Sequence, residues 1–237
     1  MITRPDIRRV LAWMTTFFIS MAFLESAVVV YLRALFYPNG FEFPIVPMHG
    51  VLVTTEVIRE FATLVMLLAP GALVTRSALE RFAWFCYGFG VWDLFYYFWL
   101  KVLLDWPSSL MTFDLLFLIP VLWVGPVWAP CVISFGLILL ALLILRGRSN
   151  GAVHLVDASA WALLITGALI MIGSFVVDPM MNAFDLDALS VAPSTRPGKE
   201  AVMTYVPTAY PWPLFAVGCI VAMAGLTRVH RKGCLVR

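Results

Sequence analysis

Seven ionisable side chains lie inside the first three long apolar segments of this chain. They are Glu25, Arg33, Glu56, Arg59, Glu60, Asp93 and Lys101. An ionisable group in hydrocarbon is costly unless it is paired or faces a wet cavity, and such groups commonly serve as proton relays, cation pathways or substrate contacts. These residues are therefore the candidates for the chemistry of this protein.

The spacing of these residues predicts that each segment gathers its polar groups on one helix face. In the second segment a single stripe holds four residues at positions i, i+3, i+4 and i+7: Glu56, Arg59, Glu60 and Thr63. In the third segment Asp93, Tyr97 and Lys101 share one side, and in the first Glu25 and Arg33 are about two turns apart. Because these faces fall in the same half of the bilayer, we expect them to surround an outward-facing polar cavity.

Asp114, in the short segment that follows, lies at the same depth and completes the candidate set. Five carboxylates then face three basic groups. Either some carboxylates are protonated, because desolvation and mutual repulsion raise their pKa, or a bound cation offsets the excess negative charge. Both states are typical of functional membrane sites.

A structural alternative needs no ligand at all. Arg59 can pair with Glu56 or Glu60 within its own helix, while Arg33 and Lys101 can extend to the headgroups. Lys101 can also bond Asp105. The same alternative leaves Glu25 and Asp93 near mid-depth without an obvious partner.

Composition identifies the protein class that must position these groups. The chain has 237 residues, of which 62% are hydrophobic and 13% charged, and its mean hydropathy is +0.93. Such a chain has too little polar surface for a soluble globule and indicates an integral membrane protein. The net charge of +2 is mild and the basic residues form no stripe, so nucleic-acid binding is not expected.

The hydropathy pattern predicts an all-α bundle, because a transmembrane helix needs roughly 20 mainly apolar residues. We predict six spans, at about residues 10–35, 50–73, 82–104, 126–146, 158–178 and 209–228. Residues 1–148 would form the polar-cavity bundle and residues 149–237 a C-terminal transmembrane hairpin. The outer loop of that hairpin, residues 179–208, is either a solvated connection or a lid.

The segment between the third and fourth spans is apolar but too short to cross a bilayer. It is opened by Pro107 and closed by Pro120 and Gly125. A serine ahead of Leu110 can cap a helix, so we expect a short helix near residues 108–119. That helix would lie along the interface or re-enter the bundle beside the cavity.

The distribution of lysine and arginine predicts the orientation. With the N-terminus inside, eleven of the 16 basic residues fall in cytoplasmic segments, as positive loops do. The expected location is therefore a plasma membrane, the inner membrane of a bacterium, with both termini in the cytoplasm.

Metal and redox chemistry find little support in the sequence. The chain has three histidines, and no pair at matched depth exists for an intramembrane haem. His49, at the start of the second span and close to Glu56, is the candidate ligand for a divalent ion. The four cysteines show no CxxC spacing, no Ser-His triad order is recognisable, and no cofactor is predicted.

Two stretches resemble a family of multi-span bacterial membrane proteins to which no activity is attached. They are ESAVVVYLRALFYPNGFEFP, residues 25–44, and residues 81–130, which contain VWDLFYYFWLKVLLDWPSS and DLLFLIPVLWVGPVWAP. The resemblance covers roughly the first 145 residues. The resemblance implies a bacterial source and gives no information about mechanism.

Three functions are compatible with these observations. The cavity can bind or conduct a small polar or cationic solute, or protons, as part of transport. Alternatively, the protein is a membrane enzyme acting on a lipid or isoprenoid, with carboxylates as acid or base and the basic groups holding an anionic headgroup. A third role is that of a non-catalytic subunit whose charges are matched by a partner subunit or a second copy.

Overall fold

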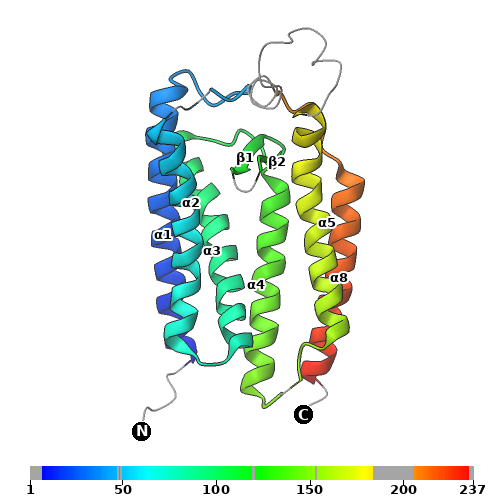
Figure 1. The fold of residues 1–237 in the computed structure, drawn as a ribbon. Helices are drawn as coiled ribbons and strands as arrows, with labels where there is room; N and C mark the ends of the chain where they lie inside the picture. The colour runs from blue at the N-terminus through cyan, green and yellow to red at the C-terminus, as the bar shows by residue number, and fades with distance from the viewer. Residues whose placement is uncertain are drawn as a thin grey trace.

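The computed structural model describes residues 7–46, 48, 50–118, 121–152, 154–183 and 205–234. Six long helices run along a common direction (Figure 1): α1 (Ile7–Phe36), α2 (Val51–Val74), α3 (Ala78–Leu104), α4 (Trp128–Ser149), α5 (Ala158–Ala183) and α8 (Trp212–Cys234). Their positions match the six predicted segments, so the predicted all-α architecture is confirmed.

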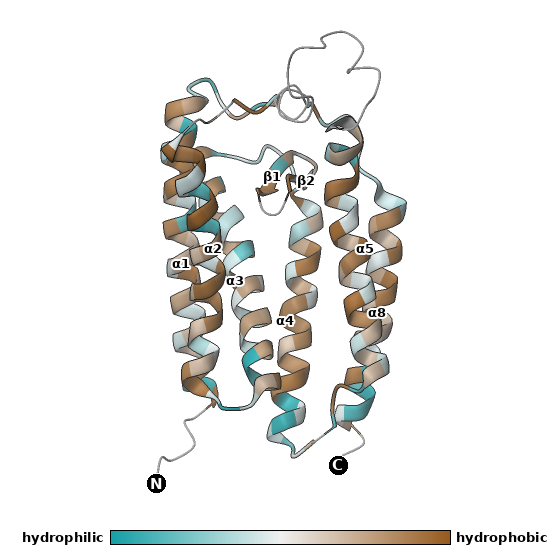
Figure 2. Cartoon of the chain, viewed as in Figure 1, coloured by the Kyte–Doolittle hydropathy of each residue, from teal (hydrophilic) through white to brown (hydrophobic). Residues whose placement is uncertain are grey.

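Five of these helices, namely α1, α2, α4, α5 and α8, are long and apolar enough to cross a membrane. The remaining predicted span, residues 82–104, corresponds to α3, a helix of 27 residues that lies among the others. Figure 2 shows hydrophobic residues along most of the bundle and hydrophilic residues at the lower ends of α4 and α8. The protein is therefore built as a membrane-embedded bundle, while the orientation of its termini stays a prediction.

The segment between α3 and α4 forms a β-hairpin in place of the predicted helix. Strands β1 (Phe113–Phe117) and β2 (Trp123–Pro126) pair antiparallel, with Asp114 opposite Gly125. A short apolar run cannot be assigned to helix or strand by periodicity alone, which explains the wrong prediction. The hairpin places its backbone polar groups in hydrogen bonds, as a segment at membrane depth must.

The hairpin lies at one end of the bundle, opposite the end at which α1 begins and α8 ends (Figure 1). We call these the hairpin end and the terminal end. Helices α1, α2 and α4 all pack on α3, α5 packs chiefly on α8, and α8 also contacts α4. The main hydrophobic core lies between these helices, with Phe18, Trp84 and Ile144 among its fully enclosed side chains.

The predicted outer loop, residues 179–208, lies largely outside the described residues. Helix α5 continues to Ala183, and the described chain resumes at Tyr205. The Tyr205 hydroxyl donates to Asp178 near the end of α5. Whether this loop is a solvated connection or a lid over the cavity therefore stays a prediction.

Candidate functional site

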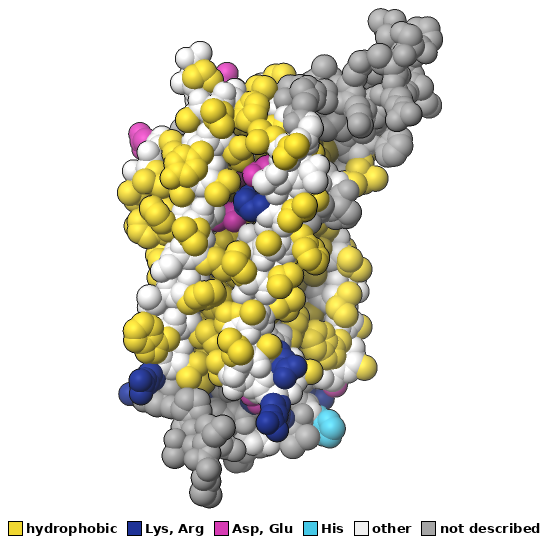
Figure 3. Space-filling view, turned by 60° about the vertical axis from the view of Figure 1, so that its left-hand side comes forward, with side chains coloured by type: hydrophobic (Ala, Val, Ile, Leu, Met, Phe, Trp, Pro, Cys, Tyr) yellow, Lys and Arg dark blue, Asp and Glu magenta, His cyan; other side chains and the backbone are white. Residues whose placement is uncertain are grey.

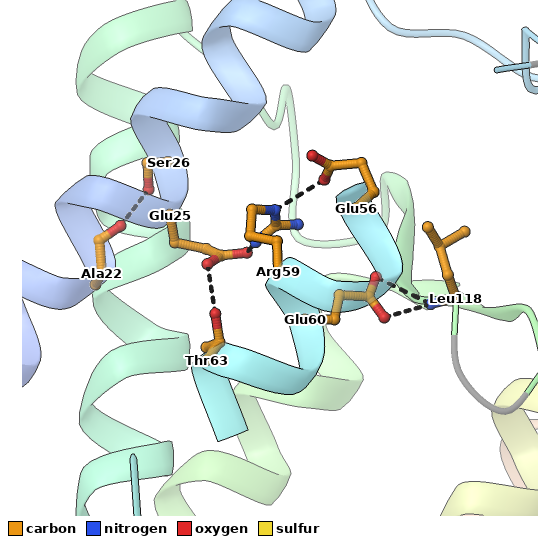
Figure 4. A network of polar contacts seen from close by, with 8 residues as sticks. All are labelled: Ala22, Glu25, Ser26, Glu56, Arg59, Glu60, Thr63 and Leu118. Atoms are coloured by element: carbon orange, nitrogen blue, oxygen red, sulfur yellow. Dashed lines mark hydrogen bonds and ion pairs between the residues drawn. The ribbon is translucent and has the colours of Figure 1, made fainter. Parts of the chain in front are cut away.

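Arg59 joins α1 to α2 at the centre of the polar cluster (Figure 4). Its Nε donates to Glu56 Oε2 at 2.8 Å, and its Nη1 donates to Glu25 Oε1. Thr63 Oγ1 donates to the other oxygen of Glu25 at 3.2 Å. One guanidinium is thus shared by two carboxylates from different helices. The predicted stripe on α2 does face Glu25.

Glu60, one residue further along α2, has a different partner. Both of its carboxylate oxygens accept the backbone N–H of Leu118, each at 3.1 Å. The side chain is buried, with 7% of the residue exposed. Glu60 therefore attaches the hairpin to α2, a role that the sequence does not reveal because it depends on a backbone donor.

Arg33 is enclosed and does not extend to the headgroups as the structural alternative expected. Its guanidinium carbon lies 3.8 Å from the ring centroid of Trp106 and 4.6 Å from that of Phe41, in cation–π geometry. Its Nη2 lies 3.5 Å from Asp114 Oδ1, and both side chains are buried. Arg33 therefore belongs to the interior of the site, where it compensates part of the charge of Asp114.

Asp93 is buried and receives a hydrogen bond from α4. Ser134 Oγ donates to Asp93 Oδ2 at 2.7 Å, and both residues are almost fully enclosed. Ser134 was missed in the sequence, since a lone serine in an apolar helix usually bonds a carbonyl of its own helix. Tyr97, one turn further along α3, is buried and lines the same cavity.

Lys101 does not belong to this cluster. Its Nζ lies 2.7 Å from Asp105 Oδ1, and it also donates to the carbonyl of Pro107 at 3.1 Å. Half of the side chain is exposed. The basic groups of the candidate site are therefore two arginines, and the excess of carboxylates is larger than the sequence predicts.

A cavity of about 640 Å³ connects these groups to the rest of the bundle. All five predicted carboxylates line it, together with Arg33 and Arg59 at the hairpin end. Further along, its walls are apolar and come from α3, α4, α5 and α8, with Leu140, Leu164 and Met223 as examples. The C-terminal helices thus contribute to a cavity that we expected from the first three spans and the Asp114 segment.

The charged cluster also reaches the outside of the bundle. Figure 3 shows a basic side chain between acidic ones on the upper half of an otherwise hydrophobic face. The side chains of Arg59 and Glu25 are 22% and 13% exposed, respectively. This part of the site is accessible from the side of the bundle, where lipid would lie.

Metal binding gains no support from the described part of the chain. There, no group of three or more His, Cys, Asp or Glu side chains is placed to hold a metal ion. His49, the candidate ligand predicted close to Glu56, lies outside the described residues.

Comparisons with known proteins found no relative of this chain. No family model, no curated protein and no solved structure matches this chain. The resemblance to a bacterial family therefore stays a prediction.

Proposed function

We propose that this membrane protein binds an amphipathic cation, with the cationic headgroup at the carboxylates and the apolar chain along the cavity. One observation carries the proposal: five carboxylates and two arginines line one end of a cavity whose remaining walls are apolar. A volume of about 640 Å³ falls within the roughly 300–1,000 Å³ usual for ligand sites.

The charge of the cavity favours a cationic headgroup. With every group ionised, the carboxylates exceed the arginines by three. Arg59 compensates Glu25 and Glu56 only in part, and Glu60 has a neutral backbone partner. A positive headgroup lowers the electrostatic energy of such a cluster, because charges interact strongly where water is scarce.

The apolar walls favour an amphiphile over a hydrated ion or a proton. Conduction requires polar groups or water along the whole path. Beyond Asp93 and Ser134, the described lining toward the terminal end is formed by side chains such as Phe82, Leu140 and Leu164. Those residues suit a hydrocarbon chain, so binding is better supported than conduction.

The enzyme hypothesis shares the apolar cavity but differs in the headgroup it requires. An anionic lipid headgroup would need basic groups in excess of acidic ones. Lys101, which was expected to help hold it, pairs with Asp105 outside the cavity. A role as a subunit in a larger complex stays a prediction that purification with a partner would test.

The proposal is tested by the binding of three probes to the purified protein in nanodiscs of zwitterionic lipid. Decyltrimethylammonium has the chain and the charge, decanesulfonate has the chain with the opposite charge, and tetramethylammonium has the charge alone. We expect saturable quenching of tryptophan fluorescence by the first probe, at least about tenfold tighter than by either other probe. Empty nanodiscs correct for partitioning into lipid.

A pair of charge-neutralising variants locates the binding site. Glu60→Gln removes one cavity charge while keeping an acceptor for Leu118, and it should weaken decyltrimethylammonium binding about fivefold. Glu80→Gln removes a carboxylate that pairs with Arg148 away from the cavity, and it should have no effect. Equal affinities in the two variants, or tighter binding of decanesulfonate, would overturn the proposal.

A further inference from the structure

The carboxylates of the cavity differ in the chemistry of the groups that bond them. Glu25 and Glu56 both accept from the guanidinium of Arg59 (Figure 4). Glu60 accepts from the backbone N–H of Leu118. Guanidinium and peptide N–H groups can only donate, so each of these partners favours the ionised form of its carboxylate.

Asp93 has a partner of another kind. Its one hydrogen bond among the described residues comes from Ser134 Oγ, at 2.7 Å. A hydroxyl both donates and accepts. Ser134 can therefore donate to the ionised carboxylate, or it can turn its hydrogen toward a carbonyl of α4 and accept from the protonated acid. This contact suits either protonation state of Asp93.

No positive charge in the described part of the chain offsets an ionised Asp93. The two cavity arginines, Arg33 and Arg59, pair with other carboxylates. The groups that act on Asp93 electrostatically are an acid, a phenol and a thiol: Asp114 of β1, Tyr97 of α3 and Cys131 of α4. Asp93 lines the cavity, and 6% of the residue is exposed. A buried carboxylate without a cation is costly, so the empty site favours the protonated acid.

We infer that the cavity exchanges a proton for the cation: Asp93 holds a proton in the empty protein and releases it when a cationic headgroup binds. The O–H bond of the acid breaks, the proton passes to water, and the remaining carboxylate pairs with the headgroup. One positive charge enters and one leaves, so the net charge of the site is unchanged. Ser134 keeps the carboxyl group hydrogen-bonded in both states. The inference rests on the proposed binding of an amphipathic cation and adds a proton as its competitor.

The test counts the protons released on binding. Decyltrimethylammonium is added to the protein in nanodiscs in weakly buffered, mildly acidic solution, and a pH-indicator dye reports the change. We expect release to approach one proton for each cation bound. By linkage, binding should tighten as the pH rises, by up to about tenfold per pH unit where Asp93 changes its state. Empty nanodiscs supply the blank.

Two single variants distinguish Asp93 from Glu60. Asp93→Asn imitates the neutral acid, so it should release no proton and should bind the probe at every pH with the affinity that wild type reaches at its acid limit. Glu60→Gln should bind more weakly yet keep the proton release and the pH dependence, because Leu118 holds Glu60 ionised in wild type. Binding without proton release, or release that persists in Asp93→Asn, would overturn the inference and leave the proposed function standing.

Infrared difference spectra of the unmodified protein keep the test valid if Asp93→Asn folds poorly. Addition of the probe should remove the C=O band of a protonated carboxyl group, and side-chain ¹³C-labelled aspartate should shift that band. Ser134→Ala should also shift it, because the hydrogen bond to Asp93 is lost. A band that follows labelled glutamate instead, or that ignores Ser134→Ala, would overturn the inference. Absence of probe binding at any pH would refute the proposed function and the exchange with it.

Discussion

The two sides of this bundle are held together by different means. On one side, Arg59 connects α1 and α2 through shared carboxylates, and Glu60 connects α2 to the hairpin. On the other side, α5 and α8 meet through small residues: a Cβ at Gly167 would lie 2.6 Å from the backbone nitrogen of Ala222. The direct contact between α1 and α2 is made by charged side chains, whereas the contact between α5 and α8 is made by close packing of small residues.

The comparison separates groups that can respond to a ligand from groups that hold the scaffold. Helix α1 is fixed to α3 by neutral hydrogen bonds, from Ser26 Oγ to the carbonyl of Tyr96 at 3.1 Å and from Trp99 Nε1 to the carbonyl of Ile19 at 3.2 Å. Its connection to α2 passes through Glu25 and Arg59, which are partly exposed. A cationic ligand competes with Arg59 for the same carboxylates, so we expect ligand binding to loosen the contact between α1 and α2.

The largest effect on stability is expected from removing the central guanidinium. Arg59→Met leaves Glu25 and Glu56 without their cation, and losing one partner of a largely buried ion pair costs about 3 kcal/mol. Lys101→Met removes a half-exposed cation that pairs with Asp105, and it should cost less than about 1 kcal/mol. The free energy of unfolding, from denaturant titration in mixed micelles, measures both.

This pair of variants tests directly whether charged side chains hold α1 against α2. Equal losses in Arg59→Met and Lys101→Met would mean that the charges between α1 and α2 contribute no more than an exposed ion pair. The charged side would then be held by its apolar contacts, as α5 and α8 are.

A somewhat smaller effect is expected where α5 and α8 make their closest approach. Gly167→Ala places a methyl group against the backbone of α8 at Ala222, and overpacking of this kind costs about 2 kcal/mol. At Gly173, in the same helix, an added Cβ would meet nothing within 4 Å, so Gly173→Ala should be neutral or slightly stabilising. The same unfolding titration compares the two.

Gly167→Ala should leave the contact between α1 and α2 intact. Because Ala222 also lines the cavity, the readout is stability and not ligand binding: Arg59→Met should cost the same free energy of unfolding in the Gly167→Ala background as in wild type. If Gly167→Ala unfolds no more readily than Gly173→Ala, the close approach of α5 and α8 contributes little to stability.

The sequence was most informative where one helix determines the geometry. Hydrophobic length located the helices, and a 3.6-residue period correctly put Glu56 and Arg59 in contact. It failed where a second element decides the outcome. The hairpin depends on the pairing of two strands, and the bonds from Leu118 to Glu60 and from Ser134 to Asp93 join different elements, so no local pattern encodes them.

The smallest effect is expected from the charges that α5 and α8 do possess, at the terminal end. Asp157 caps α5 through the N–H of Ala160 and pairs with Arg228 and Lys232 of α8 at 2.8 and 2.7 Å. Hydrogen bonds from Arg228 and Lys232 hold the pKa of Asp157 well below its ordinary value. The ionised form is therefore favoured by folding, and its contribution is complete above the unfolded pKa of about 4 and declines as the pH falls below it.

Asp157→Asn should therefore lower the melting temperature at pH 7 slightly, and the difference from wild type should shrink progressively below about pH 4. Melting curves in detergent at pH 7, 4 and 3, each at low and high salt, measure this. High salt should reduce the difference at pH 7, because these groups are exposed to solvent and their attraction is screened. A difference from wild type that is independent of both pH and salt would assign Asp157 to helix capping alone, and the α5–α8 contact would then depend on packing without any electrostatic contribution.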